Sequence, residues 1–140
     1  MKGFRLVVPL QVRFRDTDAM GHLNNAVYVT FLEVGRQEYW RQVLKVRSYT
    51  DCGIILANTK IEFRSPAFVS DLLEVGIRAT RLGKSSFDFA YEIRTQGDGR
   101  LIAEATSVQV MFDYSVRRPR PITDRERAHM TAFEGEIPGA

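Results

Sequence analysis

The chain has 140 residues, of which 44% are hydrophobic, so it is long enough and apolar enough to form one domain with its own core. Its formal net charge of +3 is too small to indicate nucleic-acid binding, although it would suit a polyanionic small molecule. The single cysteine, Cys52, excludes an intrachain disulfide and argues against a cysteine-based metal site. No stretch is apolar enough for a signal peptide or a membrane span, so we expect a cytoplasmic protein with no metal and no membrane association.

The first expected element is a strand over residues 5–15, where apolar and polar residues alternate with the period of a half-buried strand. Pro9 favours an edge position or a bulge, because proline cannot donate a ladder hydrogen bond. A long helix is expected over residues 25–44, capped by the side chain of Asn24 or Asn25. Apolar residues cover most of its surface and polar residues keep to one stripe, so other structure should wrap it, most simply a sheet.

Four further strands are expected after the helix, with a glycine-rich hairpin turn at 97–99. A capping box of Thr123 and Glu126 then opens a short helix that ends near Phe133, and the last residues are expected to be loose. A long helix followed by an antiparallel meander is an α+β arrangement, here a single domain over residues 1–140 with a five-stranded antiparallel sheet curved around the helix. The four strands are expected at 54–64, 73–80, 87–94 and 101–112.

The segment between the first strand and the helix carries most of the reactive side chains. Asp16, Asp18 and His22 lie in a loop that runs into Asn24 and Asn25 at the helix start. Unpaired amides and the positive end of the helix dipole attract negative charge there. A carboxylate facing such a helix start is a reasonable arrangement for acyl transfer, in which an oxyanion develops.

The same residues carry a resemblance to a known family. The string Asp-Thr-Asp-Ala-x-Gly-His-x-Asn-Asn-Ala-x-Tyr, at Asp16–Tyr28, resembles the signature of hotdog-fold acyl-CoA thioesterases of the 4-hydroxybenzoyl-CoA thioesterase type. Its His22–Asn25 part is also similar to an element of plant acyl-ACP thioesterases, and the later segments Phe63–Ala67 and Leu82–Ser86 fit the same pattern. The resemblance implies a hotdog fold and a homodimer or homotetramer. It also implies hydrolysis of an acyl-CoA to a free acid and coenzyme A, with no cofactor.

The resemblance assigns the catalytic carboxylate to Asp18, either as a nucleophile on the thioester carbonyl or as the base that activates water. The sequence leaves both routes open, together with the structural alternative in which Asp18 caps a turn or the helix. Asp16 is expected to shape the turn, although two close carboxylates could raise one pKa. His22 either takes part in catalysis or orientation, or is a structural loop residue.

The backbone amide of Asn25 is the oxyanion donor that the resemblance implies, because this residue begins the helix. Some hotdog thioesterases have a histidine at this position and a tyrosine at that of Phe14, and this chain lacks the general-acid help that those residues would give. Tyr28 would line the acyl pocket unless it is an ordinary core residue. Glu33, on the polar stripe of the helix, is a reserve carboxylate whose simpler interpretation is a solvated or subunit-facing charge.

The resemblance implies that the phosphates of coenzyme A bind at a later turn that carries basic and small hydroxyl residues, although a surface hairpin would look the same. The basic segment 117–120 offers similar contacts, but it lacks the interleaved aromatic residues of single-strand binders, so we expect no nucleic-acid partner. The residues expected at the turn are Arg81, Lys84, Ser85 and Ser86.

Two other functions remain as alternatives. A hotdog hydratase or dehydratase usually pairs an aspartate and a histidine in an Asp-x-Asn-Pro-x-His-like string, whereas this chain has no such proline and spaces Asp18 and His22 differently. A non-catalytic acyl-CoA-binding or RNA-binding module would use the basic tail, and strong salt dependence of nucleic-acid binding would reveal it.

Overall fold

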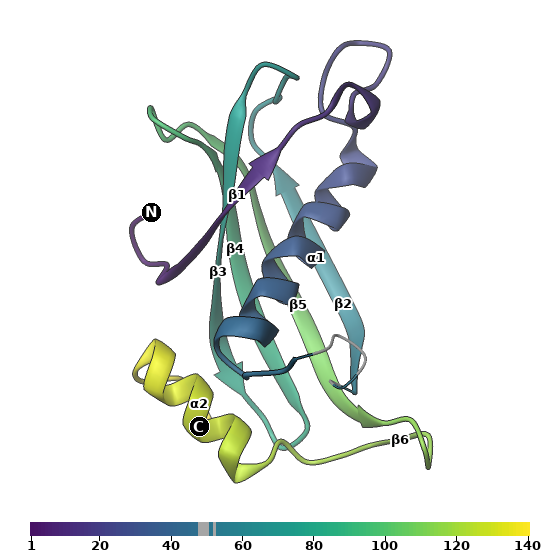
Figure 1. Cartoon of the computed structure of the whole chain (residues 1–140), viewed down its shortest axis with the longest axis vertical. Helices are drawn as coiled ribbons and strands as arrows, with labels where there is room; N and C mark the ends of the chain where they lie inside the picture. Colours follow the sequence, from purple (N-terminus) through teal and green to yellow (C-terminus); the bar gives the residue numbers. More distant parts are fainter. Residues whose placement is uncertain (48–50, 52) are drawn as a thin grey trace.

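The computed structural model describes residues 1–47, 51 and 53–140, and it shows a curved antiparallel sheet with a long helix across one face (Figure 1). The predicted α+β architecture with five main strands is confirmed, and a two-residue strand, β6 (Arg118–Pro119), pairs with the end of β5. The main strands lie in the order β1-β3-β4-β5-β2. They are β1 (Leu6–Gln11), β2 (Ile54–Phe63), β3 (Leu72–Leu82), β4 (Ser86–Thr95) and β5 (Leu101–Asp113).

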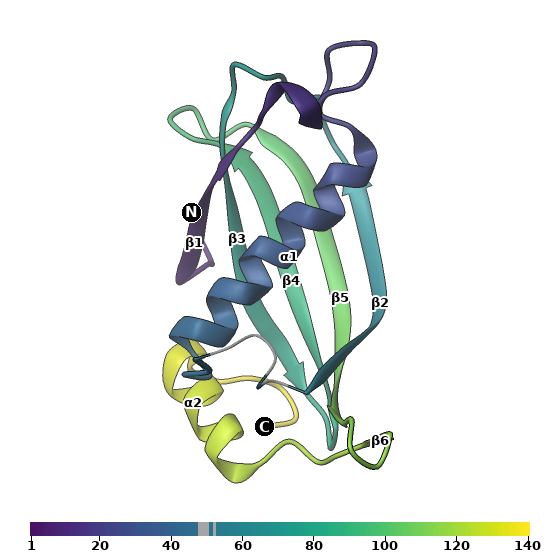
Figure 2. The ribbon, with the colours of Figure 1, turned by 45° about the vertical axis from the view of Figure 1, so that its right-hand side comes forward.

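The helix α1 (Asn25–Gln42) lies across the inner face of the sheet, as Figures 1 and 2 show from two directions. Its buried side chains pack against the inward-facing residues of the strands. Tyr39 and Phe89 meet edge to face, with ring centroids 4.7 Å apart, and each is 0% exposed. Burying one such side chain is worth about 1.5–3 kcal/mol, so this layer between helix and sheet holds the fold together. No helix of the described residues has both the length and the apolar character needed to cross a bilayer.

The prediction that the first strand reaches residue 15 is wrong, because β1 ends at Gln11. A 3₁₀ turn, Phe14–Asp16, follows it. The Asp16 carboxylate accepts a hydrogen bond from the Arg13 main-chain N–H at 2.9 Å, which tightens the chain into this turn. Phe14 continues the apolar alternation but is 84% exposed, so the alternation alone predicts a strand that is too long.

Pro9 lies on an edge strand, as predicted, since β1 is the first strand of the order and Pro9 lies opposite Glu74 of β3. The glycine turn between β4 and β5 is also confirmed, with positive φ at Gly97 and Gly99. The pairing of β2 with β5 contains a register shift between Leu56 and Asn58 that the sequence pattern did not reveal. Such a bulge bends a strand and redirects its side chains.

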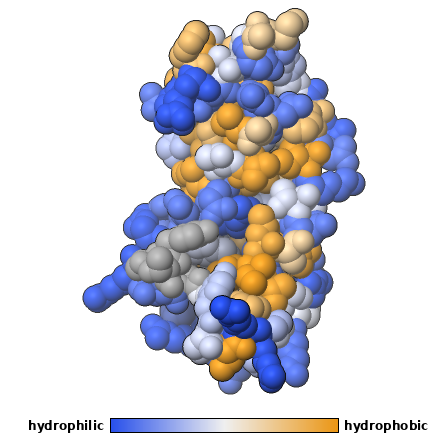
Figure 3. Space-filling model, turned by 90° about the vertical axis from the view of Figure 1, so that its right-hand side faces the viewer, coloured by the Kyte–Doolittle hydropathy of each residue, from blue (hydrophilic) through white to orange (hydrophobic). Residues whose placement is uncertain are grey.

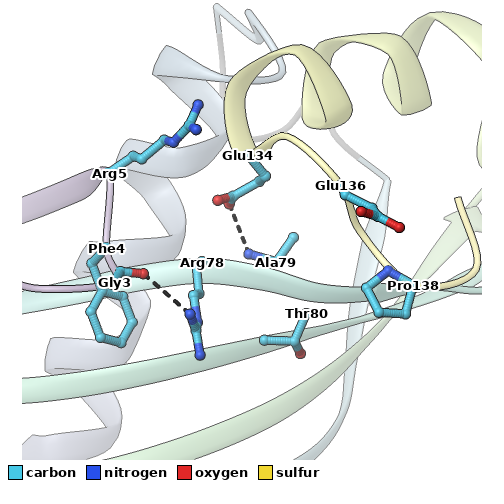
Figure 4. Close-up of a pocket in the computed structure, with 9 residues that line it drawn as sticks. All are labelled: Gly3, Phe4, Arg5, Arg78, Ala79, Thr80, Glu134, Glu136 and Pro138. Atoms are coloured by element: carbon cyan, nitrogen blue, oxygen red, sulfur yellow. Dashed lines mark hydrogen bonds between the residues drawn. The ribbon is translucent and has the colours of Figure 1, made fainter.

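The second helix, α2 (Asp124–Glu134), begins at the predicted capping box and covers the part of the β3 edge that β1 leaves unpaired (Figure 1). The Glu134 carboxylate accepts the Ala79 N–H at 2.8 Å, as Figure 4 shows. The carbonyl of Pro138 accepts the Leu82 N–H at 3.0 Å. The expectation of loose final residues is therefore wrong, because the edge amides of β3 need acceptors and the C-terminal segment supplies them.

Candidate active site

A cleft of about 280 Å³ lies at the end of the sheet where the loop after β1 meets the start of α1. It brings together all three residues predicted to be catalytic and one predicted to bind substrate. Chain segments far apart in the sequence form its walls, because β2 ends beside the helix start. The lining residues are Asp18, His22, Leu23, Asn25, Tyr28, Phe63, Arg64, Ser65 and Pro66.

The Asp18 carboxylate is exposed and is oriented by its own loop. Its Oδ1 atom accepts the main-chain N–H of Met20 at 2.9 Å and that of His22 at 3.2 Å. The main-chain N–H of Asp18 in turn donates to the His22 carbonyl at 2.8 Å. None of the described residues donates a hydrogen bond to the second oxygen, Oδ2. The turn thus holds the carboxylate in place through one oxygen and leaves the other for a ligand.

The loop is fastened to the segment that follows β2. The Leu23 N–H donates to the Ala67 carbonyl at 2.7 Å, and the backbones of His22 and Phe68 form an isolated bridge. The His22 ring packs edge-on against the Phe68 ring, with centroids 5.1 Å apart. The connection between His22 and Asp18 therefore runs through the backbone, while the imidazole is oriented by an aromatic neighbour.

Asp16 has the turn-forming role expected for it. It is 4% exposed, and the Arg13 guanidinium donates to both carboxylate oxygens, at 3.2 and 3.1 Å. These hydrogen bonds hold the pKa of the Asp16 carboxyl below its ordinary value of 3.8, against the opposing effect of burial. The Asp16 carbonyl accepts the Asn24 N–H at 2.8 Å and so helps to position the helix start. An ionised, paired carboxylate of this kind is poorly suited to act as a base near neutral pH.

Asn24 is the N-cap of α1, and its side-chain oxygen accepts the Ala26 N–H at 3.0 Å. The next residue, Asn25, is the first of the helix, and none of the described residues accepts its main-chain N–H. This amide belongs to the positive end of the helix dipole and lies at the cleft. It can therefore donate to an oxygen atom of a bound ligand.

Tyr28 lies beneath this amide, one turn into α1. The residue is 2% exposed, and its ring packs edge to face against Phe63 with centroids 5.0 Å apart. Burial raises the pKa of the Tyr28 hydroxyl, and the positive charge of Arg100 opposes that shift. Tyr28 therefore contributes a neutral, largely apolar wall to the cleft.

Arg100 is a structural residue of this end that the sequence did not identify. Its Nη1 atom donates to the Pro66 carbonyl at 2.8 Å and to Ser65 Oγ at 3.1 Å, and its Nη2 atom donates to Asp71 at 3.2 Å. It thereby secures the segment that forms one wall of the cleft. The only signal in the sequence was indirect, because the turn before β5 and the end of β2 meet only once the strand order is known.

The residues predicted to hold coenzyme A phosphates lie at the other end of the sheet, at the turn between β3 and β4. Arg81 donates there to the Asp88 carboxylate at 2.9 and 2.7 Å and to Ser86 Oγ at 3.0 Å. The length of β2 separates this turn from the cleft, about 30 Å at the usual rise per strand residue. Within one chain, Arg81, Lys84, Ser85 and Ser86 are therefore not brought to Asp18.

A larger groove of about 560 Å³ lies along the edge of β3, next to α2 (Figure 4). Two of its charged side chains have structural partners: Glu134 accepts the Ala79 amide, and Arg5 donates to the Phe133 carbonyl at 2.7 Å. Among residues 1–47, 51 and 53–140, no group of three or more histidine, cysteine or acidic residues is placed to hold a metal ion. Cys52 lies outside the described residues.

Similarity to known proteins extends over most of the chain. A family model described as the thioesterase-like superfamily matches residues 12–129. The long-chain acyl-CoA thioesterase FadM of Escherichia coli (strain K12) is 27% identical over 111 residues, which cover 78% of this chain and 84% of that protein. A 1,4-dihydroxy-2-naphthoyl-CoA hydrolase of Crocosphaera subtropica is 24% identical over 115 residues, covering 76% and 82%.

The crystal structure of a thioesterase from Thermus thermophilus, complexed with coenzyme A and Zn, is similar over nearly its whole length. Its TM-score is 0.88 at 29% identity, covering 97% of this chain and 98% of that one. The match to the family model spans the meander from β2 to β5 as well as the loop and α1, so it includes both walls of the cleft. The chain therefore belongs to the thioesterase-like superfamily, as a hotdog-fold thioester hydrolase.

Proposed function

We propose that this protein hydrolyses an acyl-CoA thioester to a free acid and coenzyme A in the cleft at the start of α1. The observation that carries the proposal is the meeting of two groups at one cleft, the Asp18 carboxylate and the unpaired main-chain amide of Asn25. A nucleophile or base beside a fixed oxyanion donor is the arrangement that acyl transfer requires. The family relationship supports the same reaction.

In this mechanism the thioester carbonyl oxygen accepts the Asn25 N–H at the positive end of α1. Negative charge that develops on this oxygen is stabilised by a donor that does not reorganise during the reaction. Asp18 then either attacks the carbonyl carbon, which forms an anhydride that water hydrolyses, or removes a proton from a water molecule that attacks directly. In both routes the bond to sulfur breaks and the thiolate of coenzyme A leaves. His22 supports Asp18 through its main-chain N–H, which holds Oδ1.

The experiment is hydrolysis of a panel of short, medium, long and aromatic acyl-CoAs by the wild type and by Asp18→Asn. Asparagine keeps an oxygen for the Met20 and His22 amides but loses the charge, so turnover should fall roughly a hundredfold or more with little change in folding. Loss of thioester absorbance is the measurement, because Cys52 would add background to a thiol-detecting assay.

The matched control is Asp113→Asn. Asp113 also holds a main-chain amide two residues ahead, that of Ser115 at 2.9 Å, but it lies at the opposite end of the sheet. This control should keep wild-type turnover. Unchanged turnover in Asp18→Asn would assign the chemistry to another carboxylate, and no turnover by the wild type on any substrate would contradict hydrolysis of acyl-CoAs.

We further propose that the active enzyme is an assembly joined through β2. The free edge of β2 has ten residues and no proline, whereas the free edge of β1 contains Pro9. Antiparallel pairing of two β2 strands about a two-fold axis would set the Ile54 end of one strand beside the Phe63 end of the other. The second subunit's turn between β3 and β4 would then approach this chain's cleft. Such an arrangement gives Arg81, Lys84, Ser85 and Ser86 a route to the phosphates of coenzyme A.

A further inference from the structure

A row of hydrogen-bonded, buried polar side chains crosses the inner face of the sheet beneath the second half of α1. It begins at Arg36, which is 3% exposed, and this guanidinium forms an ion pair with Glu33 one turn earlier. Arg36 Nη1 also donates to the Tyr91 hydroxyl at 3.1 Å. A buried cation is costly unless it is paired and hydrogen-bonded, and Arg36 has both an ion pair and a hydrogen bond to a buried hydroxyl.

At the other end of this row, polar atoms lack hydrogen-bond partners. The Tyr91 hydroxyl and Ser107 Oγ lie 2.6 Å apart, and Gln109 Nε2 donates to the same Ser107 oxygen. Gln109 is 1% exposed, yet its Oε1 atom has no hydrogen-bond partner among the described residues. The Thr59 Oγ1 atom, on the neighbouring strand, is also buried without a partner in the described part of the chain. Unpartnered buried polar atoms are rare in folded proteins, and each one calls for an explanation.

The carboxamide of Gln109 can be oriented in two ways, which place either its nitrogen or its oxygen next to Ser107. Arginine can only donate, so the Tyr91 hydroxyl accepts from Arg36 and donates its own hydrogen bond to Ser107. Ser107 then either accepts from Gln109 Nε2 as well, which leaves its own proton for another acceptor, or donates that proton to Gln109 Oε1 in the exchanged orientation of the amide. In the orientation of the structure, the far end of the Gln109 carboxamide is the unpartnered Oε1 atom. The far end offers an acceptor in this orientation and donors in the exchanged one.

The two unpartnered groups flank Ser107. Thr59 lies directly opposite Ser107 across the β2–β5 ladder, and Gln109 is the next inward-facing residue of β5. The register shift between Leu56 and Asn58 lies beside Gln109, where a bulge loosens the ladder. A ligand group placed over Ser107 would therefore meet both polar atoms.

A strip of partly exposed residues on β2 leads from the candidate cleft toward this position. The helix α1 packs most closely over β1 and β3. Near the opposite edge of the sheet, on β2, Thr59 and Ile61 are only partly buried. Phe63, a wall of the cleft, is on the same face of β2 as these two residues. Thr59 lies about 13 Å from Phe63 along the strand, at the usual rise of about 3.3 Å per residue. An acyl group that enters at the cleft and follows β2 would reach the polar pair with its distal part.

We propose that Gln109 and Thr59 form the distal, polar end of the acyl-binding site, and that the preferred acyl group carries a hydroxyl remote from the thioester. This inference rests on the proposed thioesterase function. A hydroxyl both donates and accepts, so it satisfies Gln109 in either amide orientation and Thr59 as well. A plain hydrocarbon chain would leave both groups unpaired, and sites of this kind discriminate against analogues that lack the hydroxyl.

The test uses two acyl-CoAs of equal chain length, one saturated and one with a terminal hydroxyl, over a series of chain lengths. The wild type should show a kcat/KM about tenfold or more higher for the hydroxylated member at the best length. In Gln109→Leu this ratio should fall to about twofold or less, chiefly because the saturated substrate improves. The control Gln42→Leu, on the exposed end of α1, should keep the wild-type ratio. Thr59→Val serves as an independent variant if Gln109→Leu does not fold.

Equal kcat/KM for the two substrates in the wild type, or an unchanged ratio in Gln109→Leu and Thr59→Val, would overturn the inference. The unpartnered atoms would then be explained by a trapped water molecule. Absence of turnover on every substrate would instead contradict the proposed function. In that case the polar site is tested by calorimetry, which measures binding of the free acid and of the free hydroxy acid. The hydroxy acid should bind more tightly to the wild type, and this difference should be lost in Gln109→Leu and Thr59→Val.

Discussion

Asp16 and Asp18 are separated by one residue, yet their surroundings give them different properties. Asp16 is buried and paired with Arg13, whereas Asp18 is exposed at the cleft and uses one oxygen to hold its loop. The motif identified both residues from the sequence, including the turn-forming role of Asp16. It could not identify Arg13 as the partner, or Arg100 as the residue that secures the opposite wall, because such pairings depend on side-chain geometry.

The first expected outcome at this scale concerns Asp16→Asn. The variant should lose about 1–3 kcal/mol of the free energy of unfolding at pH 7, because a buried acceptor of charge-assisted hydrogen bonds is weakened. The pKa of Asp16 is lowered in the folded state, so its contribution is present above the ordinary value of 3.8 and is lost as pH falls through the folded pKa. Urea titrations from pH 7 into the acid range measure both effects.

Arg13→Gln is the reciprocal variant, and it should remove the same stabilisation. The double variant should lose little more than either single one, because the two residues act as a pair. Fully additive losses, or an acid dependence that survives in Asp16→Asn, would show that the pair does not account for the stabilisation.

The start of α1 shows how an element serves the site. Asn24 caps the helix through the Ala26 amide, and its own N–H binds the Asp16 carbonyl. These bonds determine where the unpaired amide of Asn25 lies. The cap, α1 itself and the capping box of α2 were all predictable, since they are local patterns. The early end of β1 and the bulge in β2 were not, because a carboxylate–guanidinium contact and cross-strand register decide them.

Removing this cap should affect both stability and turnover. Asn24→Ala is expected to cost about 0.5–2 kcal/mol of the free energy of unfolding and to lower turnover, because fraying of the first turn displaces the Asn25 amide. Thr123→Ala, which removes the cap of α2, is the matched comparison. It should cost similar stability with wild-type turnover. Equal turnover in the two variants would argue against a catalytic role for the start of α1.

At the scale of the whole molecule, the free edge of β2 is the surface most open to a second chain. Leu56 is 40% and Phe63 48% exposed along this strand. Figure 3 views this side of the molecule and shows hydrophobic surface between hydrophilic regions. The resemblance implied a dimer or tetramer, but periodicity could not identify the surface. Only the strand order shows which strands have a free edge.

A charge on this edge should weaken the proposed assembly. Leu56→Glu places a carboxylate on each of two symmetry-related strands and should shift sedimentation toward the monomer, with turnover falling at the same protein concentrations. Leu72→Glu, at an exposed leucine of β3, is the control and should leave both measurements unchanged. An assembly that resists Leu56→Glu would locate the interface elsewhere.

The opposite edge of the sheet has a consequence for what the protein can build. On β1, Pro9 has no N–H to donate to an added strand. Where β3 extends past β1, its Ala79 and Leu82 N–H groups already donate to Glu134 and Pro138. A sheet that can extend at only one edge stops growing once two copies have joined. Concentrated protein should therefore form closed particles and resist the strand-by-strand addition that leads to fibrils.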